Sequence, residues 1–450
     1  MAIQTAETTS RTQLSRVALA TVIGTTIEWY DFFIYGSMAG LVFGKLFFEP
    51  AGTQGALLLS FASVGISFLF RPLGAVLAGH FGDRIGRRAM LVVTLSLMGG
   101  ATTLIGVIPT YAQGGVLAPV LLIVLRIVQG ISVGGEWGGA ILMAVEHAPE
   151  GRRGRYGAFP QLGVPFGLLL ASGVIALMTG VISPGDAFTE WGWRVPFLIS
   201  FLFVAVGYVI RRRVEESPVF QALDTERAKD QDIPFVQLVK KHWALVLLAA
   251  LTYAGNNACG YITTGGFVQG YVTTPLDEGG AVGIENTTIL IIIALVAGVY
   301  AITTFVGGDL SDRIGRKRTY LVGWAIFLVA SFALFPLLDT GSSLLIFLAL
   351  AAFQTGNGFT YGPQPAFFSE LFPADIRYTA VAVTYALGAL LGGAFTPLVA
   401  TAIVQATGNS FFVSLYLAAM IVIAAVATWL IKDRTDGRLM PSADKRTTVG

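Results

Sequence analysis

Two carboxylates and two arginines stand inside apolar stretches of this sequence, and these four side chains could move or hold charge. Glu28 and Asp31 are three residues apart, Arg71 lies in a second apolar stretch, and Arg126 lies in another. An ionisable side chain inside a membrane-spanning helix costs about 2.5 kcal/mol or more, so each needs a partner or a watery cavity. A carboxylate can take up a proton, and an arginine can bind a carboxylate or an anionic ligand.

These residue types suggest a mechanism that couples the binding of an anion to the binding of a proton. An arginine beside a carboxylate favours the charged form, whereas an anion that captures the arginine frees the carboxylate to accept a proton. We expect Asp31 or Glu28 to carry the proton, and Arg126 or Arg71 to neutralise that carboxylate or to hold an anionic substrate. A permanent structural ion pair is the alternative, and a structural role weighs most for Arg71 and Glu136.

The second half of the chain carries no charge inside its apolar stretches, but it offers side chains that suit the recognition of hydroxyl and carboxyl groups. These candidates are Tyr253, Asn256, Asn257, Tyr261, Gln354, Asn357 and Tyr385. Tyr253, Asn257 and Tyr261 recur at four-residue spacing, so they share one helix face that could line a cavity near the bilayer midplane. Asn257 with Tyr261 is the preferred pair, and interhelical hydrogen bonding is the alternative for each residue.

A ten-residue phrase occurs twice, which indicates two related halves. Residues 79–88 read GHFGDRIGRR and residues 308–317 read GDLSDRIGRK. The aspartate can pair with arginines or with a facing helix N-terminus, the glycine permits a tight turn, and the arginines can reach glutamates on neighbouring helices. We predict a conformational latch, although charges that only fix the topology are the alternative. Its residues are Gly79, Asp83, Arg84, Gly86, Arg87, Arg88, Glu146, Asp312, Arg313, Gly315, Arg316, Glu370 and Arg377.

Long apolar helices must position these residues. The chain is 54% hydrophobic and 12% charged, which is about half the charged share of an ordinary soluble protein. Apolar runs of about twenty residues are long enough to cross a membrane as helices, so we predict an all-α membrane protein. The twelve predicted helices are 16–47, 54–80, 88–109, 115–147, 154–182, 190–211, 241–272, 286–311, 318–338, 342–370, 377–404 and 409–431.

The repeat divides these helices into two bundles of six. The predicted boundaries are an N-terminal tail at 1–15, a bundle at 16–211, a linker at 212–240, a bundle at 241–431 and a C-terminal tail at 432–450. Of the 29 lysines and arginines, all but Lys45, Arg71, Arg126 and Arg194 fall on the side of both termini. Positive residues concentrate on the cytoplasmic side of membrane proteins, so both termini and the linker are predicted to be cytoplasmic.

The repeated phrase resembles the loop motif of the major facilitator superfamily, and further phrases resemble its metabolite:proton symporter family. These phrases are Gly24–Phe33, Phe70–Gly74, Arg126–Gly139, Trp191–Phe197 and Glu215–Pro218. The resemblance covers essentially the whole chain. It implies the major facilitator fold, with twelve transmembrane helices in two pseudo-symmetric six-helix bundles. It also implies transport of shikimate, α-ketoglutarate, citrate and related acids, or of proline and betaine, together with protons.

Other kinds of chemistry find little support in the sequence. The glycines of Gly134–Gly139 lack the Lys-Ser/Thr and the preceding strand of a phosphate-binding loop, so we read them as helix-packing glycines. Cys259 has no second cysteine to pair with, and no metal-ligand spacing occurs. His80, His147 and His242 lie near predicted helix ends and receive no transport role. We therefore expect no enzyme, no cofactor, no metal and no nucleic-acid partner.

We expect a proton-coupled symporter in the bacterial inner membrane. It is expected to work as a monomer, with a small-molecule substrate, protons and the lipid bilayer as its partners. An organic acid such as shikimate or a mono- or dicarboxylate is favoured as substrate. The segment after the last predicted helix is short, whereas proline and betaine members of the resembling family usually carry a long C-terminal extension. A proline or betaine symporter is the alternative. A receptor that has lost transport would lack the buried Asp31 and Arg126.

Overall fold

A computed structural model describes residues 11–85, 87–134, 137–146, 148–212, 234–264, 266–274, 281–373 and 376–432. Within these ranges every regular element is a helix. Helices are the expected solution for so apolar a chain, because hydrocarbon offers the backbone no hydrogen-bonding partners. Nine helical segments of the described part are long and apolar enough to span a membrane, and Val93–Ile105 and Leu117–Val133 are shorter apolar helices. The prediction of an all-α membrane protein is confirmed.

The helices of the first half follow the predicted ranges with several interruptions. They are α1 (Arg11–Met38), η1 (Ala39–Phe43), α2 (Gly44–Phe47), η2 (Glu49–Ala51), α3 (Gly52–Ile85), α4 (Arg87–Ile105), α5 (Tyr111–Gly114), α6 (Leu117–Val133), α7 (Trp137–Glu146), α8 (Arg153–Gln161), α9 (Gly163–Leu177), η3 (Met178–Ile182), η4 (Phe188–Gly192) and α10 (Arg194–Arg212).

The second half repeats this pattern of long and divided helices. Its elements are α12 (Pro234–Thr264), α13 (Phe267–Thr273), α14 (Asn286–Ile314), α15 (Arg316–Leu338), α16 (Ser343–Tyr361), α17 (Gln364–Leu371), α18 (Arg377–Gly388), η6 (Ala389–Gly393), α19 (Thr396–Thr407) and α20 (Phe411–Leu430). Each of the twelve predicted helices coincides with one continuous or divided run of these elements.

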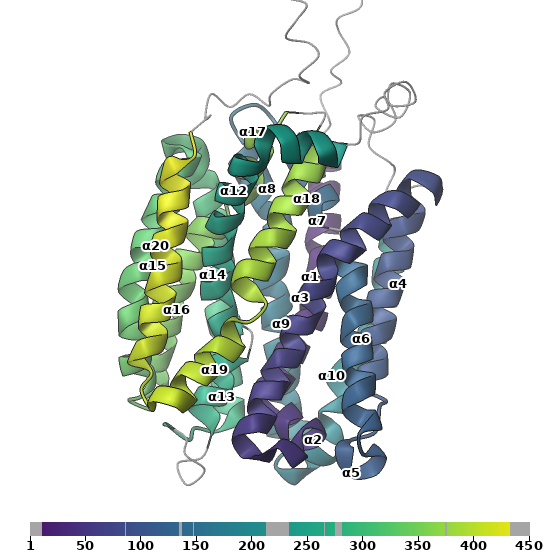
Figure 1. Ribbon diagram of the computed structural model, residues 1–450, viewed down its shortest axis with the longest axis vertical. Coiled ribbons are helices and arrows are strands. Elements are labelled where there is room, and N and C mark those ends of the chain that lie inside the picture. Colours follow the sequence, from purple (N-terminus) through teal and green to yellow (C-terminus); the bar gives the residue numbers. More distant parts are fainter. Residues whose placement is uncertain are drawn as a thin grey trace, which may run out of the picture.

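The two halves lie side by side, with α1–α10 in purple to blue and α12–α20 in teal to yellow (Figure 1). They touch where α8 and α9 pack on α14 and where α3 packs on α18 and α19. We call the end with α17 and the start of α8 the motif face, and the end with α2, α5 and α13 the opposite face (Figure 1). The linker and the tails lie largely outside the described residues, so the domain boundaries stay predictions.

Helix α14 ends later than predicted, which shortens the loop of the second motif copy. The apolar run stops at Ser311, but the helix continues through Asp312 to Ile314. It ends where Gly315 adopts a φ of 97°, a backbone conformation that favours glycine, and α15 begins at Arg316. The loop is therefore this single glycine, and the charges on either side of it belong to helix ends.

Glycines bring α3 and α6 into backbone contact, which fixes the neighbourhood of the buried arginines. A β-carbon added at Gly130 would overlap the Ser67 carbonyl, and one added at Gly74 would overlap the Ile131 carbonyl. Close approach of this kind is typical of small residues at helix interfaces in membranes. One helical turn before Gly130, Arg126 can therefore reach the backbone of α3.

Candidate functional site

A small cavity lies among α1, α3, α4 and α6, and the structure brings all four of the predicted charged residues to its wall. The lining includes Glu28, Asp31, Arg71 and Arg126. The cavity has room for about one or two water molecules beside these groups. The two helix-1 carboxylates and the two arginines therefore share one small space, as a coupled site requires.

The hydrogen bonds of Arg126 all go to residues of the first half. It donates to the carbonyl oxygens of Ser63 (3.3 Å) and Val64 (3.0 Å), to Ser67 Oγ (2.8 Å) and to Gln129 Oε1 (2.8 Å). Its guanidinium carbon also lies 3.8 Å from the centre of the Tyr35 ring. Arg126 thus ties α6 to α3, and the expected ion pair between Arg126 and Asp31 is not formed.

Asp31 is bound on one side only. Its Oδ1 accepts a hydrogen bond of 2.6 Å from the hydroxyl of Ser200 on α10. Its Oδ2 is buried and has no hydrogen-bond partner within the described part of the chain. Sequence reasoning missed Ser200, because a single serine in an apolar helix gives no signal until the packing of α10 against α1 is known.

Arg71 is buried but far less engaged than Arg126. Its guanidinium carbon lies 4.0 Å from the centre of the Phe68 ring and 5.7 Å from that of Phe32. Its Nε and Nη1 are buried and have no hydrogen-bond partner among the described residues. Its guanidinium lies beside the hydroxyls of Tyr261 and Tyr385, which belong to the second half. Arg71 is therefore the cation with donors to spare for a ligand.

Three of the predicted polar residues of the second half bind one another across α12 and α16. Asn256 donates to Asn357 Oδ1 (2.9 Å) and to Thr360 Oγ1 (2.7 Å). Asn357 donates to Gln354 Oε1 (2.7 Å), and Gln354 donates to Thr263 Oγ1 (2.8 Å). These contacts match the interhelical alternative for Asn256, Gln354 and Asn357.

The predicted tyrosines lie nearer to the first half. Tyr253 stacks on Tyr385, with ring centres 4.8 Å apart. Tyr261 meets Phe32 of the cavity wall edge to face at 5.1 Å. Asn257 donates to the Tyr253 carbonyl (3.1 Å), so its amide serves its own helix. Of the preferred pair Asn257 and Tyr261, it is Tyr261 that meets a residue lining the cavity.

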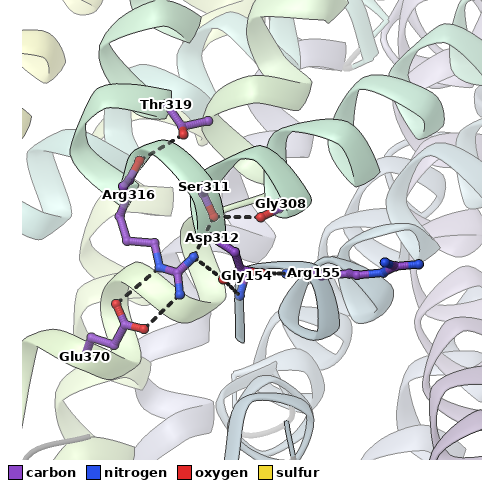
Figure 2. Close-up of polar contacts among 9 residues, drawn as sticks. Gly154, Arg155, Gly308, Ser311, Asp312, Arg316, Thr319 and Glu370 are labelled. Atoms are coloured by element: carbon purple, nitrogen blue, oxygen red, sulfur yellow. Dashed lines mark hydrogen bonds and ion pairs between the residues drawn. The ribbon is translucent and has the colours of Figure 1, made fainter. Parts of the chain in front are cut away.

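The second motif copy joins the two halves at the motif face (Figure 2). Asp312 accepts hydrogen bonds from the backbone N–H groups of Gly154 and Arg155, each 2.8 Å long, at the start of α8. Arg316 donates to Asp312 Oδ1 at 2.6 Å. The carboxylate thus meets both an arginine and the N-terminus of a helix from the other half, where negative charge is stabilising.

Further ion pairs surround this contact. Arg316 binds both oxygens of Glu370, at 3.0 and 3.2 Å, and Arg377 reaches Glu146 of the first half at 3.4 Å. Arg313 pairs with Asp309 on its own helix and is largely exposed. Because Arg316, Glu370 and Arg377 are buried, the expectation that only the first half buries charge is wrong. The buried charge of the second half sits at the motif face.

The first motif copy cannot be compared in this way. Gly86 lies outside the described residues, as do the side-chain environments of Gly79, Asp83, Arg84, Arg87 and Arg88. Their part in a latch stays a prediction. Glu136 also lies outside the described residues, so its structural role stays a prediction.

A family profile described as Major Facilitator Superfamily matches residues 21–390 and, in a second match, residues 258–448. The chain belongs to the major facilitator superfamily. The inner membrane metabolite transport protein YhjE of Escherichia coli (strain K12) is 37% identical to it over 417 residues, covering 92% of this chain and 93% of that protein. A shikimate transporter of the same organism is 36% identical over 429 residues, covering 95% and 96%.

A putative proline/betaine transporter of Staphylococcus haemolyticus (strain JCSC1435) is 33% identical over 439 residues, covering 96% of this chain and 91% of that protein. Among solved structures, a D-xylose-proton symporter superposes with a TM-score of 0.74 at 19% identity, covering 95% and 99%. This major facilitator is therefore a metabolite transporter and not an enzyme, and it is a multi-pass protein of the inner-membrane type. The resemblance to the branch with shikimate and proline/betaine transporters is confirmed.

Proposed function

We propose that this major facilitator is a proton-coupled symporter that imports a small carboxylate-bearing metabolite by alternating access. One observation carries the proposal. Arg71 has two buried nitrogens without hydrogen-bond partners in the described structure, and it shares a cavity with Asp31, whose Oδ2 is likewise unpartnered. A substrate carboxylate would satisfy the guanidinium, and a proton would neutralise Asp31.

The coupling follows from the cost of burying unpaired charge. A charged Asp31 beneath closed helices would leave one carboxylate oxygen without a partner, which costs several kcal/mol. A proton on Asp31 removes most of that cost, and a carboxylate on Arg71 does the same for the arginine. The halves therefore close most readily when both sites are filled, which is the condition for symport. Glu28, on the same cavity wall, is the second candidate for the proton.

The C-terminal half supplies the other wall of the binding site in this proposal. Tyr261 and Tyr385 lie within the field of Arg71, and Tyr253 stacks on Tyr385. Asn256, Asn257, Gln354 and Asn357 hold this wall in place through hydrogen bonds within and between α12 and α16, and we assign them to its support.

An organic acid such as shikimate, or a mono- or dicarboxylate, is the proposed substrate class. The identity to a shikimate transporter and the unpartnered guanidinium of Arg71 both support it. A proline or betaine symporter is the second candidate. The rings of Trp29, Phe32 and Tyr261 lie together and could face a quaternary ammonium, and one relative is named a putative proline/betaine transporter.

The motif face is proposed to be cytoplasmic, together with both termini and the linker. The arginines at the start of α8 and of α15 support this orientation by the positive-inside rule. The ion pairs around Asp312 would then close the cytoplasmic side and would break when the two six-helix bundles rock. We propose that one chain suffices for transport, so the active unit is a monomer.

Uptake by the purified protein in vesicles tests this function. The panel consists of labelled shikimate, α-ketoglutarate, citrate, proline and glycine betaine, with the vesicle exterior acidic. We expect concentrative uptake of at least one acid that a protonophore abolishes. Accumulation of betaine or proline alone would favour the second candidate. If folded protein accumulates none of the five in response to the gradient, the symporter proposal is wrong.

A further inference from the structure

The helix that ends at Tyr361 is broken beside the contact between the halves. Helix α16 stops at Tyr361, Gly362 and Pro363 follow, and α17 resumes at Gln364. A β-carbon added at Gly362 would overlap the Thr304 carbonyl of α14, so only glycine fits there. A proline at this point cannot donate to the preceding turn of a helix. The break thus sets the backbone of Tyr361 against α14.

Tyr361 is held from both halves but leaves its own hydroxyl unused. Its carbonyl accepts a hydrogen bond from Gln161 Nε2 of the first half at 3.2 Å. Its side chain is buried, and its hydroxyl has no hydrogen-bond partner within the described chain. Buried hydroxyls almost always have a partner, so one without a partner at the contact between the halves calls for an explanation.

The surroundings of Tyr361 place it at the wall that faces the first half. Its ring centre is 6.2 Å from that of Tyr300, and its hydroxyl lies in the electrostatic field of Tyr300, Tyr261, Tyr385 and Glu28. Glu28 lines the cavity of the first half, as Arg71 does. The first half thus contributes an unpartnered guanidinium, and the second half an unpartnered neutral phenol.

We infer that Tyr361 forms the uncharged pole of the substrate site, where its hydroxyl binds a hydroxyl or carbonyl oxygen at the end of the substrate remote from its carboxylate. The inference rests on the proposed function, in which Arg71 holds the carboxylate. It narrows the substrate to hydroxylated or oxo carboxylic acids. A quaternary ammonium group has neither a hydrogen-bond donor nor an acceptor, so betaine would leave this phenol unsatisfied.

Such a pole selects by hydrogen bonding. A site built to bind a hydroxyl discriminates strongly against an analogue that lacks it, because the buried groups of the site then stay unpaired. A single neutral hydrogen bond of about 1 to 1.5 kcal/mol corresponds to roughly a tenfold preference. A substrate that satisfies both poles also binds the two halves together, which favours the closed state.

The test compares shikimate with cyclohex-1-ene-1-carboxylate, which has the same ring and carboxylate but no hydroxyl groups. We expect wild-type protein to favour shikimate in kcat/KM, and Tyr361→Phe to reduce that preference about tenfold, through loss of shikimate transport alone. Tyr320→Phe is the matched control, because this buried tyrosine packs on Phe367 inside the second half and should leave the ratio unchanged.

Several results would overturn the inference. One such result is that Tyr361→Phe lowers the transport of both acids by the same factor. Another is that the wild-type protein binds and transports both acids equally, and this comparison needs no variant. Accumulation of betaine with neither acid would overturn it while leaving proton-coupled transport in place. Absence of any gradient-driven uptake would remove the proposed function itself. The substrate-free Tm of Tyr361→Phe should equal or exceed that of wild type, since the lost hydroxyl had no partner.

Discussion

Asp312 of α14 caps the first turn of α8 from the other half of the protein. Each of its carboxylate oxygens accepts one backbone hydrogen bond of 2.8 Å, from Gly154 and from Arg155. Arg316 approaches the same carboxylate at 2.6 Å and is itself held by Glu370. The Asp312 carboxylate, the N-terminus of α8 and the ion pair of Arg316 with Glu370 thus meet at one point between the halves (Figure 2).

Removing the charge of Asp312 should therefore loosen the motif face. We expect Asp312→Asn to weaken the closed motif face by about 1–3 kcal/mol, because it loses the helix-terminus interaction and the partner of a buried arginine. Distances between spin labels on the motif-face ends of α8 and α14 would show a larger open population. Arg313→Gln, at an exposed residue paired only within α14, should change that population little. Equal effects of the two variants would contradict the assignment.

Asp31 should be required for coupling but not for substrate exchange. Asp31→Asn keeps the size of the side chain and removes the titratable oxygen, so we expect concentrative uptake to fall at least about tenfold while counterflow persists. Ser200→Ala removes the 2.6 Å hydrogen bond to Asp31 and should shift the pH dependence of uptake without abolishing it. Asp186→Asn, the same change at an exposed position, is the control. Gradient-driven accumulation by Asp31→Asn at the wild-type level would exclude Asp31 as the proton carrier.

The two buried arginines should differ in what their loss does. Arg126→Gln removes four buried hydrogen bonds, three of which tie α6 to α3, so we expect a loss of about 2–4 kcal/mol in stability, seen as a lower Tm in detergent. Nε and Nη1 of Arg71 bind nothing within the described chain, so Arg71→Gln should lower Tm less than Arg126→Gln does, while KM for a carboxylate substrate rises at least about tenfold. If Arg71→Gln lowers Tm and Arg126→Gln raises KM instead, then Arg126 binds the substrate and Arg71 is the structural arginine.

The fold was largely predictable because it rests on the length and polarity of segments. Apolar runs located all twelve helices, and the repeated phrase indicated the two halves. Helix ends were predicted less well, since a helix continues through charged residues until a residue such as Gly315 stops it. The break after Tyr361 was missed, because apolar residues resume within α17 and the whole run was taken as one helix.

The site was predictable in its residues but not in their partners. Buried charge is rare, so the sequence singled out Asp31, Arg71 and Arg126. Which arginine is satisfied depends on the close approach of α3 and α6 at Gly130, and this contact joins residues far apart in the chain. Tyr361 could not be singled out from the sequence, because one tyrosine among many differs from the others only once its hydroxyl is found buried without a partner in the described chain.

The opposite face closes through backbone contacts of α1 and η1 with Gly266, between α12 and α13. A β-carbon added at Gly40 would overlap the Gly266 carbonyl, and one added at Gly266 would overlap the Gly36 carbonyl. Beside them, Gln269 Nε2 donates to Ser37 Oγ at 3.1 Å. The closed state of this face therefore needs glycine on both sides of the contact.

Gly40→Ala should hold the opposite face open. The added methyl group meets backbone, which cannot rotate away as a side chain can, so we expect transport to fall at least about tenfold while the protein stays folded. Labels on α2 and α13 should report a larger separation than in wild type. Gly24→Ala lies in α1, which leads into η1, at a point where a β-carbon would meet nothing within 4 Å, and it should transport normally. If Gly40→Ala transports as well as Gly24→Ala, closure of this face does not depend on the glycine contact.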